Sequence, residues 1–187
     1  CDVLLVAGPP QSGKTTTLAT MVTSLVRATP DVLLYYLGNR RSLLPRSLPW
    51  TRAVTTPEDV SELSQEITRV LEKDPPAPGT LAVVIEGVGD FLNSVADLAL
   101  QDLVKACRNC EQTVIAEGET SGLAGSWPLL QAVKSGRHGL VLQPDQGDGD
   151  LLFRTPFPRS NRADFPPGRG YYVRSGRVAR VQVALPE

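Results

Sequence analysis

The chain has 187 residues, in which 19 lysines and arginines nearly balance 20 aspartates and glutamates. That length suits one domain with a sizeable core. The near-zero net charge gives no overall electrostatic signature of nucleic-acid binding, although it does not exclude it. No apolar run approaches the roughly 20 residues of a membrane span. Because Cys1 stands in place of methionine and a strand pattern follows almost at once, we expect a single module, residues 1–187, excised from a longer polypeptide.

The first predicted strand and the first predicted helix enclose a glycine-rich turn. Residues 2–7 (DVLLVA) are a continuous apolar run, as a strand buried on both faces requires. Residues 14–28 (KTTTLATMVTSLVRA) space their apolar side chains as a helix does. The turn, within GPPQSGKTTT, matches the pattern G-x-x-x-x-G-K-[ST] at Gly8, Gly13, Lys14 and Thr15. A phosphate-binding loop needs both a preceding strand and a following helix, and the sequence predicts both.

This turn predicts a cradle for the phosphates of a nucleotide. Glycines let the backbone wrap closely around phosphate oxygens, and the amino end of the following helix favours an anion. Lys14 is expected to reach the β- and γ-phosphates, and the Thr15 hydroxyl to bind Mg²⁺. The residues predicted to contact the nucleotide are Gly8, Pro9, Pro10, Gln11, Ser12, Gly13, Lys14, Thr15 and Thr16.

Strand and helix patterns then alternate. A proline- and arginine-rich connection, from residue 38 to about 51, separates the second strand from a helix that begins after Thr56, the expected N-cap, with Pro57 at its first position. The further predicted strands are residues 31–37, 80–87, 112–118 and 139–144, and the further predicted helices are residues 57–73, about 95–108, and a broken stretch at 121–135. This alternation predicts an α/β fold with a mostly parallel sheet covered on both faces.

The carboxyl-terminal part has a different character. From residue 152 onward it holds seven arginines and a single acidic residue before Glu187, and residues 171–185 predict a hairpin that turns at Ser175 and Gly176. Two interpretations of the arginines stay open. They form a solvated face, or they contact phosphate groups or a partner subunit, for which guanidinium groups are well suited.

Two cysteines, Cys107 and Cys110, form a C-x-x-C pair. A redox or zinc pair has this spacing, but so do two small residues stacked on one face at the end of a helix. His138 is the only histidine and no second cysteine pair exists, so a four-ligand Cys/His zinc site cannot be assembled within the chain. We therefore interpret the pair as structural, with free thiols that suit a reducing compartment.

The order of these motifs resembles the ATPase modules of the FtsK/SpoIIIE family, in the RecA-like branch of P-loop NTPases. The resemblance runs from LLVAGPPQSGKTTTLATMV through LAVVIEGVGDFL and SGRHGLVLQPD…GDLLF to PPGRGYYV…VQVA. The closing signature is similar to that of the carboxyl-terminal ATPase modules of EccC/EssC-type proteins of type VII secretion. The resemblance implies a RecA-like fold with helices flanking a mostly parallel sheet, a carboxyl-terminal β-hairpin, and ATP with Mg²⁺ as the ligand.

The resemblance also indicates what the site lacks. Glu86 stands where active members carry a metal-binding aspartate, and it could serve the ion through a water. Gly87 stands where they carry the glutamate that acts as general base, and glycine cannot accept a proton. Asp90 matches a further acidic position, and we interpret it as a cap on the following helix rather than as a substitute base. No residue is assigned as the catalytic base, and Glu86 and Asp90 are the candidates that remain. Gly118, between Glu117 and Glu119, replaces a glutamine that senses the γ-phosphate.

Loss of a general base costs roughly 10²–10⁴ in rate, whereas phosphate binding by the loop survives it. The resemblance therefore implies a module that holds ATP–Mg²⁺, hydrolyses it weakly or not at all, and has a regulatory or substrate-recognition role in a secretion motor. Two alternatives stay open. One is an active DNA-translocating motor domain, against which Gly87 argues, and the other is a protein-interaction module with a vestigial nucleotide site.

The implied partners are neighbouring ATPase modules, a signal peptide of a secreted protein and further copies of the chain, with DNA less favoured. Arg137 and Arg169 are candidates for arginines that act across a subunit interface, although a plain surface role is favoured for each. The implied location is a cytoplasmic domain of a membrane-associated bacterial protein, with any membrane contact made by parts outside this sequence.

Overall fold

The computed structural model describes residues 3–186, so Cys1 and Asp2, which opens the first predicted strand, lie outside the described residues, as does Glu187. The strands are β1 (Val3–Gly8), β2 (Leu33–Leu37), β3 (Arg52–Val54), β4 (Leu81–Ile85), β5 (Thr113–Glu119), β6 (His138–Leu142), β7 (Arg169–Arg174) and β8 (Arg177–Gln182). The α-helices are α1 (Lys14–Ala28), α2 (Leu44–Ser47), α3 (Pro57–Lys73), α4 (Asp97–Asn109), α5 (Pro128–Lys134) and α6 (Asp148–Phe153). Short 3₁₀ helices span Val88–Phe91, Thr120–Leu123 and Arg162–Asp164.

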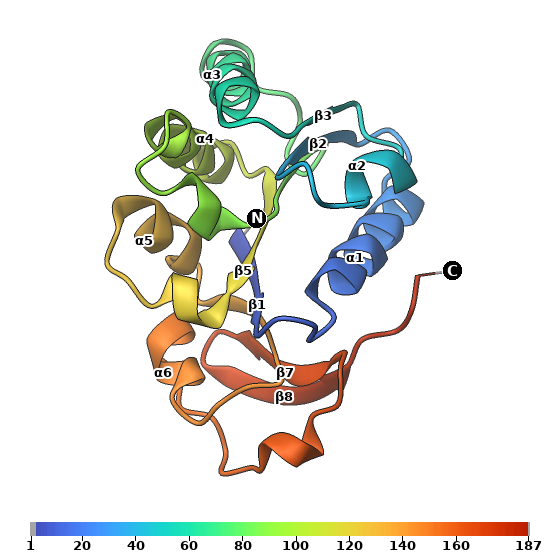
Figure 1. Cartoon of the computed structure of the whole chain (residues 1–187). Coiled ribbons are helices and arrows are strands. Elements are labelled where there is room, and N and C mark those ends of the chain that lie inside the picture. Colours follow the sequence, from blue (N-terminus) through green and yellow to red (C-terminus); the bar gives the residue numbers. More distant parts are fainter. Residues whose placement is uncertain (1–2, 187) are drawn as a thin grey trace.

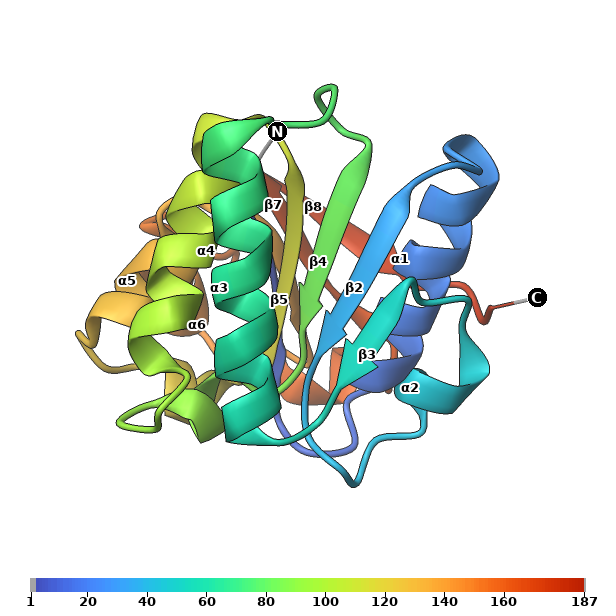
Figure 2. The ribbon, with the colours of Figure 1, turned by 90° about the horizontal axis from the view of Figure 1, so that it is seen from above.

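Within the described residues, these strands form one sheet in the order β3-β2-β4-β5-β1-β6-β7-β8. The strands from β3 to β6 run parallel, and β7 and β8 continue the sheet antiparallel as a hairpin. Helices α3, α4 and α5 cover one face, and α1 and α2 cover the other (Figures 1 and 2). The five residues of β4 are all buried, because a central strand packs against helices on both sides.

Alternate residues of each strand face different helical layers. Leu5, Val83 and Val114 belong to the core under α3, α4 and α5. Val6, Val84 and Ile115, one position further along, pack in the core under α1. This period of two decides which side chains at the strand ends can face α1.

The predicted α/β fold is confirmed, with a mostly parallel sheet and a carboxyl-terminal hairpin. Thr56 is the N-cap of α3, and its hydroxyl accepts a hydrogen bond from the backbone N–H of Asp59 at 3.1 Å. The hairpin turns at Ser175 and Gly176, both with positive φ (51° and 75°), as a two-residue turn between twisted strands requires.

The connection between the second strand and α3 is more ordered than predicted, because it contains α2 and β3. Strand β3 has three residues, pairs with β2 at the sheet edge, and none of its side chains is fully buried. Such a short edge strand carries no hydrophobic alternation. Among residues 3–186, no helix combines the length and the apolar character that crossing a membrane requires.

Candidate nucleotide site

The predicted phosphate loop joins the carboxyl end of β1 to the amino end of α1. Gln11 and Gly13 both have positive φ, 63° and 98°, which turns the backbone back on itself. A Cβ at Gly8 would lie 2.5 Å from the Ser12 Oγ, so this first glycine is required by the tightness of the turn. The loop therefore has the compact backbone that its glycine spacing predicts.

Lys14 lies at the start of α1 and turns back across the loop. Its Nζ donates a hydrogen bond to the Pro9 carbonyl oxygen at 3.0 Å. The same Nζ lies 3.6 Å from the Glu117 Oε1. The ammonium that would receive the phosphates is thus held between a loop carbonyl and a buried carboxylate.

Glu86 follows β4 directly and faces α1. Its Oε1 accepts a hydrogen bond from the Thr15 hydroxyl at 3.2 Å, so the two predicted metal-binding residues meet. Its Oε2 accepts a hydrogen bond from the hydroxyl of Tyr36 on β2. Burial and this bond to Glu86 raise the pKa of Tyr36 far above its usual range, which keeps the phenol protonated as a donor. Sequence reasoning missed Tyr36, although its place at alternate spacing in β2 puts it on the same face as Glu86.

Gly87, which the sequence resemblance aligns with a general base, has a left-handed backbone with φ of 73°. Its N–H donates to the Glu117 Oε2 at 2.9 Å. A Cβ at Gly87 would lie 2.8 Å from the Asp90 Oδ2. The conformation and the crowding both favour glycine here.

Asp90 does not cap the following helix, so this interpretation is wrong. The N-cap of α4 is Ala96, with no side-chain hydrogen bond, and Asp90 lies earlier, in the 3₁₀ helix Val88–Phe91. The exposed Asp90 Oδ2 instead accepts a hydrogen bond from the Asn39 amide at 3.3 Å. The tight turn after Gly87 inserts this short helix, which separates Asp90 from the start of α4.

The side chain of β5 that faces Lys14 is Glu117, not the residue at position 118. Gly118 lies on the opposite face, where a Cβ would meet Leu123 at 3.1 Å. Glu117 and Glu86 are each 6% exposed. Burial raises the pKa of Glu117, while the Gly87 N–H and the Lys14 ammonium oppose that rise.

A cavity of about 420 Å³ lies at this edge of the sheet, where the carboxyl ends of β4 and β5 meet the start of α1. Its lining includes Lys14, Asn39, Glu86, Gly87, Asp90 and Glu117. The structure therefore brings together the lysine of the loop and both predicted acidic residues, and adds Glu117. At the position of the general base stands a glycine, which offers no side chain.

Two hydrogen bonds connect the carboxyl-terminal segment, residues 168–184, to the phosphate loop and to α1. The Gly168 N–H donates to the Ser12 carbonyl oxygen at 2.8 Å, and the Thr20 hydroxyl donates to the Ala184 carbonyl oxygen at 2.8 Å. Gly168 also has positive φ, 80°. The PPGRG turn could be recognised in the sequence as part of the family resemblance. Its sequence alone did not predict that it packs against the phosphate loop.

The two candidate interfacial arginines lie apart. Arg169 follows Gly168, and its Nε donates to the Gln182 Oε1 at 3.1 Å within the hairpin. Arg137 is exposed and precedes β6, whose first residue pairs with Leu4 near the start of β1. Arg137 therefore lies at the amino ends of the parallel strands, whereas Lys14 lies at their carboxyl ends.

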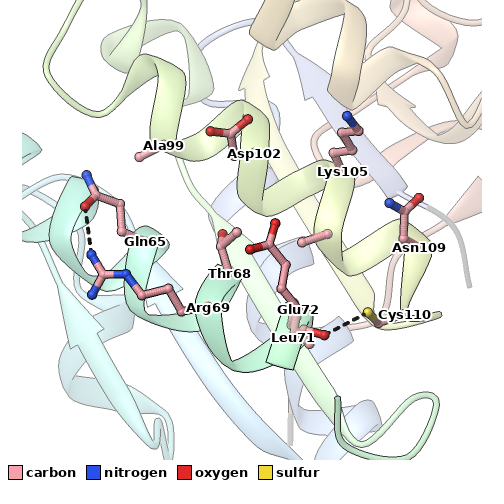
Figure 3. Close-up of a pocket in the computed structure, with 11 residues that line it drawn as sticks. Gln65, Thr68, Arg69, Leu71, Glu72, Ala99, Asp102, Lys105, Asn109 and Cys110 are labelled. Carbon is pink, nitrogen blue, oxygen red and sulfur yellow. Dashed lines mark hydrogen bonds between the residues drawn. The ribbon is translucent and has the colours of Figure 1, made fainter. Parts of the chain in front are cut away.

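The C-x-x-C pair lies at the end of α4, as the structural interpretation predicts. Cys107 is buried, and burial raises its pKa to about 12. Cys110 borders a cavity of about 580 Å³ between α3 and α4, and its thiol donates to the Leu71 carbonyl oxygen at 3.4 Å (Figure 3). Among the described residues, no group of three or more His, Cys, Asp or Glu side chains is arranged to hold a metal.

Solved structures share this architecture over the whole chain. An ATPase matches with a TM-score of 0.78 and 21% identity, over 100% of this chain and 80% of its own. The fold is that of a P-loop ATPase. Thermomonospora curvata EccC (ATPases 2 and 3), solved in complex with a signal sequence peptide, matches with a TM-score of 0.75 and 23% identity. That match covers 100% of this chain but only 37% of the EccC chain.

A third structure, the pCW3 conjugation coupling protein TcpA in its monomer form with ATPγS, has a TM-score of 0.72 and 12% identity, over 100% of this chain and 61% of its own. No protein-family model and no curated protein sequence matches the chain. The resemblance to EccC-type ATPase modules is thus confirmed at the level of the fold.

Proposed function

We propose that this chain is a nucleotide-binding module of an FtsK/SpoIIIE-type secretion motor, which holds ATP–Mg²⁺ and hydrolyses it little. The observation that carries the proposal is the hydrogen bond from Thr15 to Glu86, which lines the same cavity as Lys14. Lys14 would bind the β- and γ-phosphates, and Thr15 and Glu86 would hold Mg²⁺. The fold shared with an ATPγS complex of TcpA supports a nucleotide as the ligand.

Weak hydrolysis follows from the residues around the cavity. Gly87 offers no proton acceptor, and the exposed Asp90 is engaged with Asn39. The mechanism is therefore binding without an efficient base. Backbone amides and Lys14 orient the phosphates, while nothing at position 87 activates a water.

The biological role that we propose is regulatory or substrate recognition, exercised on neighbouring ATPase modules. The similar EccC structure, which contains ATPases 2 and 3 and a signal sequence peptide, supports these partners. The module would act on the cytoplasmic side of a bacterial membrane-associated assembly. Arg137 lies far from this chain's own loop, so it could act only on the nucleotide site of another module.

The proposal is tested by calorimetric titration of the chain with ATP–Mg²⁺ and by steady-state phosphate release. Lys14→Ala should weaken binding at least about tenfold, because it removes the charge that pairs with the phosphates. Turnover should stay near background in both proteins. Absence of binding at millimolar nucleotide, with the protein folded, would contradict the site. Robust turnover that Lys14→Ala abolishes would show that another carboxylate serves as base.

A further inference from the structure

A buried carboxylate already occupies the neighbourhood of the lysine that a nucleotide needs. The Glu117 Oε1 lies 3.6 Å from the Lys14 Nζ, and both side chains are nearly closed off from solvent, at 8% and 11% exposure. Because Lys14 is expected to reach the β- and γ-phosphates, Glu117 stands beside the place of the terminal phosphate. A nucleotide must share Lys14 with this carboxylate.

Glu117 cannot readily move away to make room. Its Oε2 accepts the Gly87 N–H at 2.9 Å, and Gly87 is itself fixed in a tight left-handed turn. Strand β5 is paired on both sides, with β1 and β4, and Glu117 pairs with Val6. The carboxylate is therefore a fixed part of the wall, unlike a surface side chain that could swing into solvent.

The charge balance around the cavity is unfavourable to a further anion. Among the described residues that line it, Lys14 is the one cation, and the Mg²⁺ that Glu86 would help to hold offsets Glu86, which leaves Asp90, Glu117 and Glu119. Burial raises the pKa of Glu117, whereas the Gly87 N–H and the Lys14 ammonium oppose that rise and favour its charged form. A like charge within about 4–6 Å disfavours an added anion, and low solvent exposure weakens screening. A triphosphate brings more negative charge to this cavity than a diphosphate does, so it experiences more of this repulsion.

We propose that Glu117 is a specificity-determining residue, which makes this site bind a nucleoside diphosphate in preference to the triphosphate. The inference rests on the proposed nucleotide site, which still binds ATP–Mg²⁺ but binds the diphosphate more tightly. Lys14 and the loop amides hold the phosphates common to both nucleotides, whereas Glu117 acts against the γ-phosphate.

The experiment compares calorimetric affinities of the whole chain for ADP and for the slowly hydrolysed analogue ATPγS, both at saturating Mg²⁺. The wild-type protein should bind ADP about tenfold or more tightly than ATPγS, given one like charge near the γ-phosphate. Glu117→Gln removes the charge but keeps an oxygen for the Gly87 N–H, and it should bring the two affinities within about threefold. Glu111→Gln is the matched control, because it removes the same charge from the exposed turn before β5 and should leave the ratio unchanged.

Thermal unfolding establishes that each variant is folded, and Glu117→Thr is a second variant without the charge. Equal affinities in the wild type, or a preference that survives in both variants, would overturn the inference while leaving the nucleotide site intact. If neither variant folds, the wild-type ratio decides alone. Failure of the folded wild type to bind either nucleotide would instead contradict the proposed site itself, and the inference with it.

Discussion

Among single residues, Gly87 determines whether a carboxylate base can be introduced into the site. Its φ is 73°, and a Cβ added there would lie 2.8 Å from the Asp90 Oδ2. Gly87→Glu should therefore cost about 1–3 kcal/mol of stability without restoring turnover. Gly89→Glu is the matched control, since a Cβ there meets nothing within 4 Å and its stability should change little. Urea unfolding and phosphate release measure both effects. A strong rise in ATP turnover in Gly87→Glu, but not in Gly89→Glu, would show that the missing base alone accounts for the slow hydrolysis.

At the scale of elements, the turn before β7 is a structural part of the phosphate loop. Gly168→Ala places a Cβ in a left-handed residue, 2.9 Å from the Gln182 Nε2, and should disturb the hydrogen bond from Gly168 to Ser12. Gly79→Ala is the control, because Gly79 has φ of 75° with nothing within 4 Å of a Cβ. We expect each variant to lose about 1–2 kcal/mol of stability, whereas only Gly168→Ala should weaken nucleotide binding, measured by calorimetry. Equal nucleotide affinities in the two variants would show that the turn before β7 does not contribute to nucleotide binding by the phosphate loop.

Helices and strands differ in how well they could be predicted from the sequence. Long periodic or buried segments, such as α3 and β4, are predictable because burial on a helix stripe or on two strand faces imposes a pattern. Strand β3 and helix α2 carry no such pattern, since each is short and lies at an edge. In the site, the loop follows from its glycines. That Glu117 faces Lys14 could not be predicted, because a shift of one residue in a strand moves the side chain to the other face of the sheet. Tyr36 could not be predicted as a site residue either, because its sequence context is that of an ordinary core aromatic.

At the scale of the whole molecule, positive charge gathers in the carboxyl-terminal part. Seven arginines lie beyond residue 152, but Arg169 bonds Gln182, and Arg180 bonds the Asp164 carbonyl oxygen and lies over the Phe165 ring. Exposed Arg174 and Arg177 flank the hairpin turn. Phosphate contacts from these two arginines alone would give a salt slope of only about −2 for duplex DNA. Fluorescence anisotropy at 50 and 200 mM salt, roughly the range over which such slopes are seen, should therefore show weak binding that Arg174→Gln with Arg177→Gln abolishes. Tight binding with a steep slope would favour a DNA motor instead.

The position of β1 in the sheet has a consequence for how the protein is made. Its two neighbours, β5 and β6, begin at Thr113 and His138, and the hydrogen bond that supports Ser12 comes from Gly168. Within this module, β1 is synthesised before both of its partner strands, so neither of its edges can be paired until β5 has emerged from the ribosome. A nascent chain in this interval carries an unpaired apolar strand, which is the kind of surface on which chains aggregate. Within the module, the phosphate loop is synthesised well before the strands and the turn that complete its surroundings.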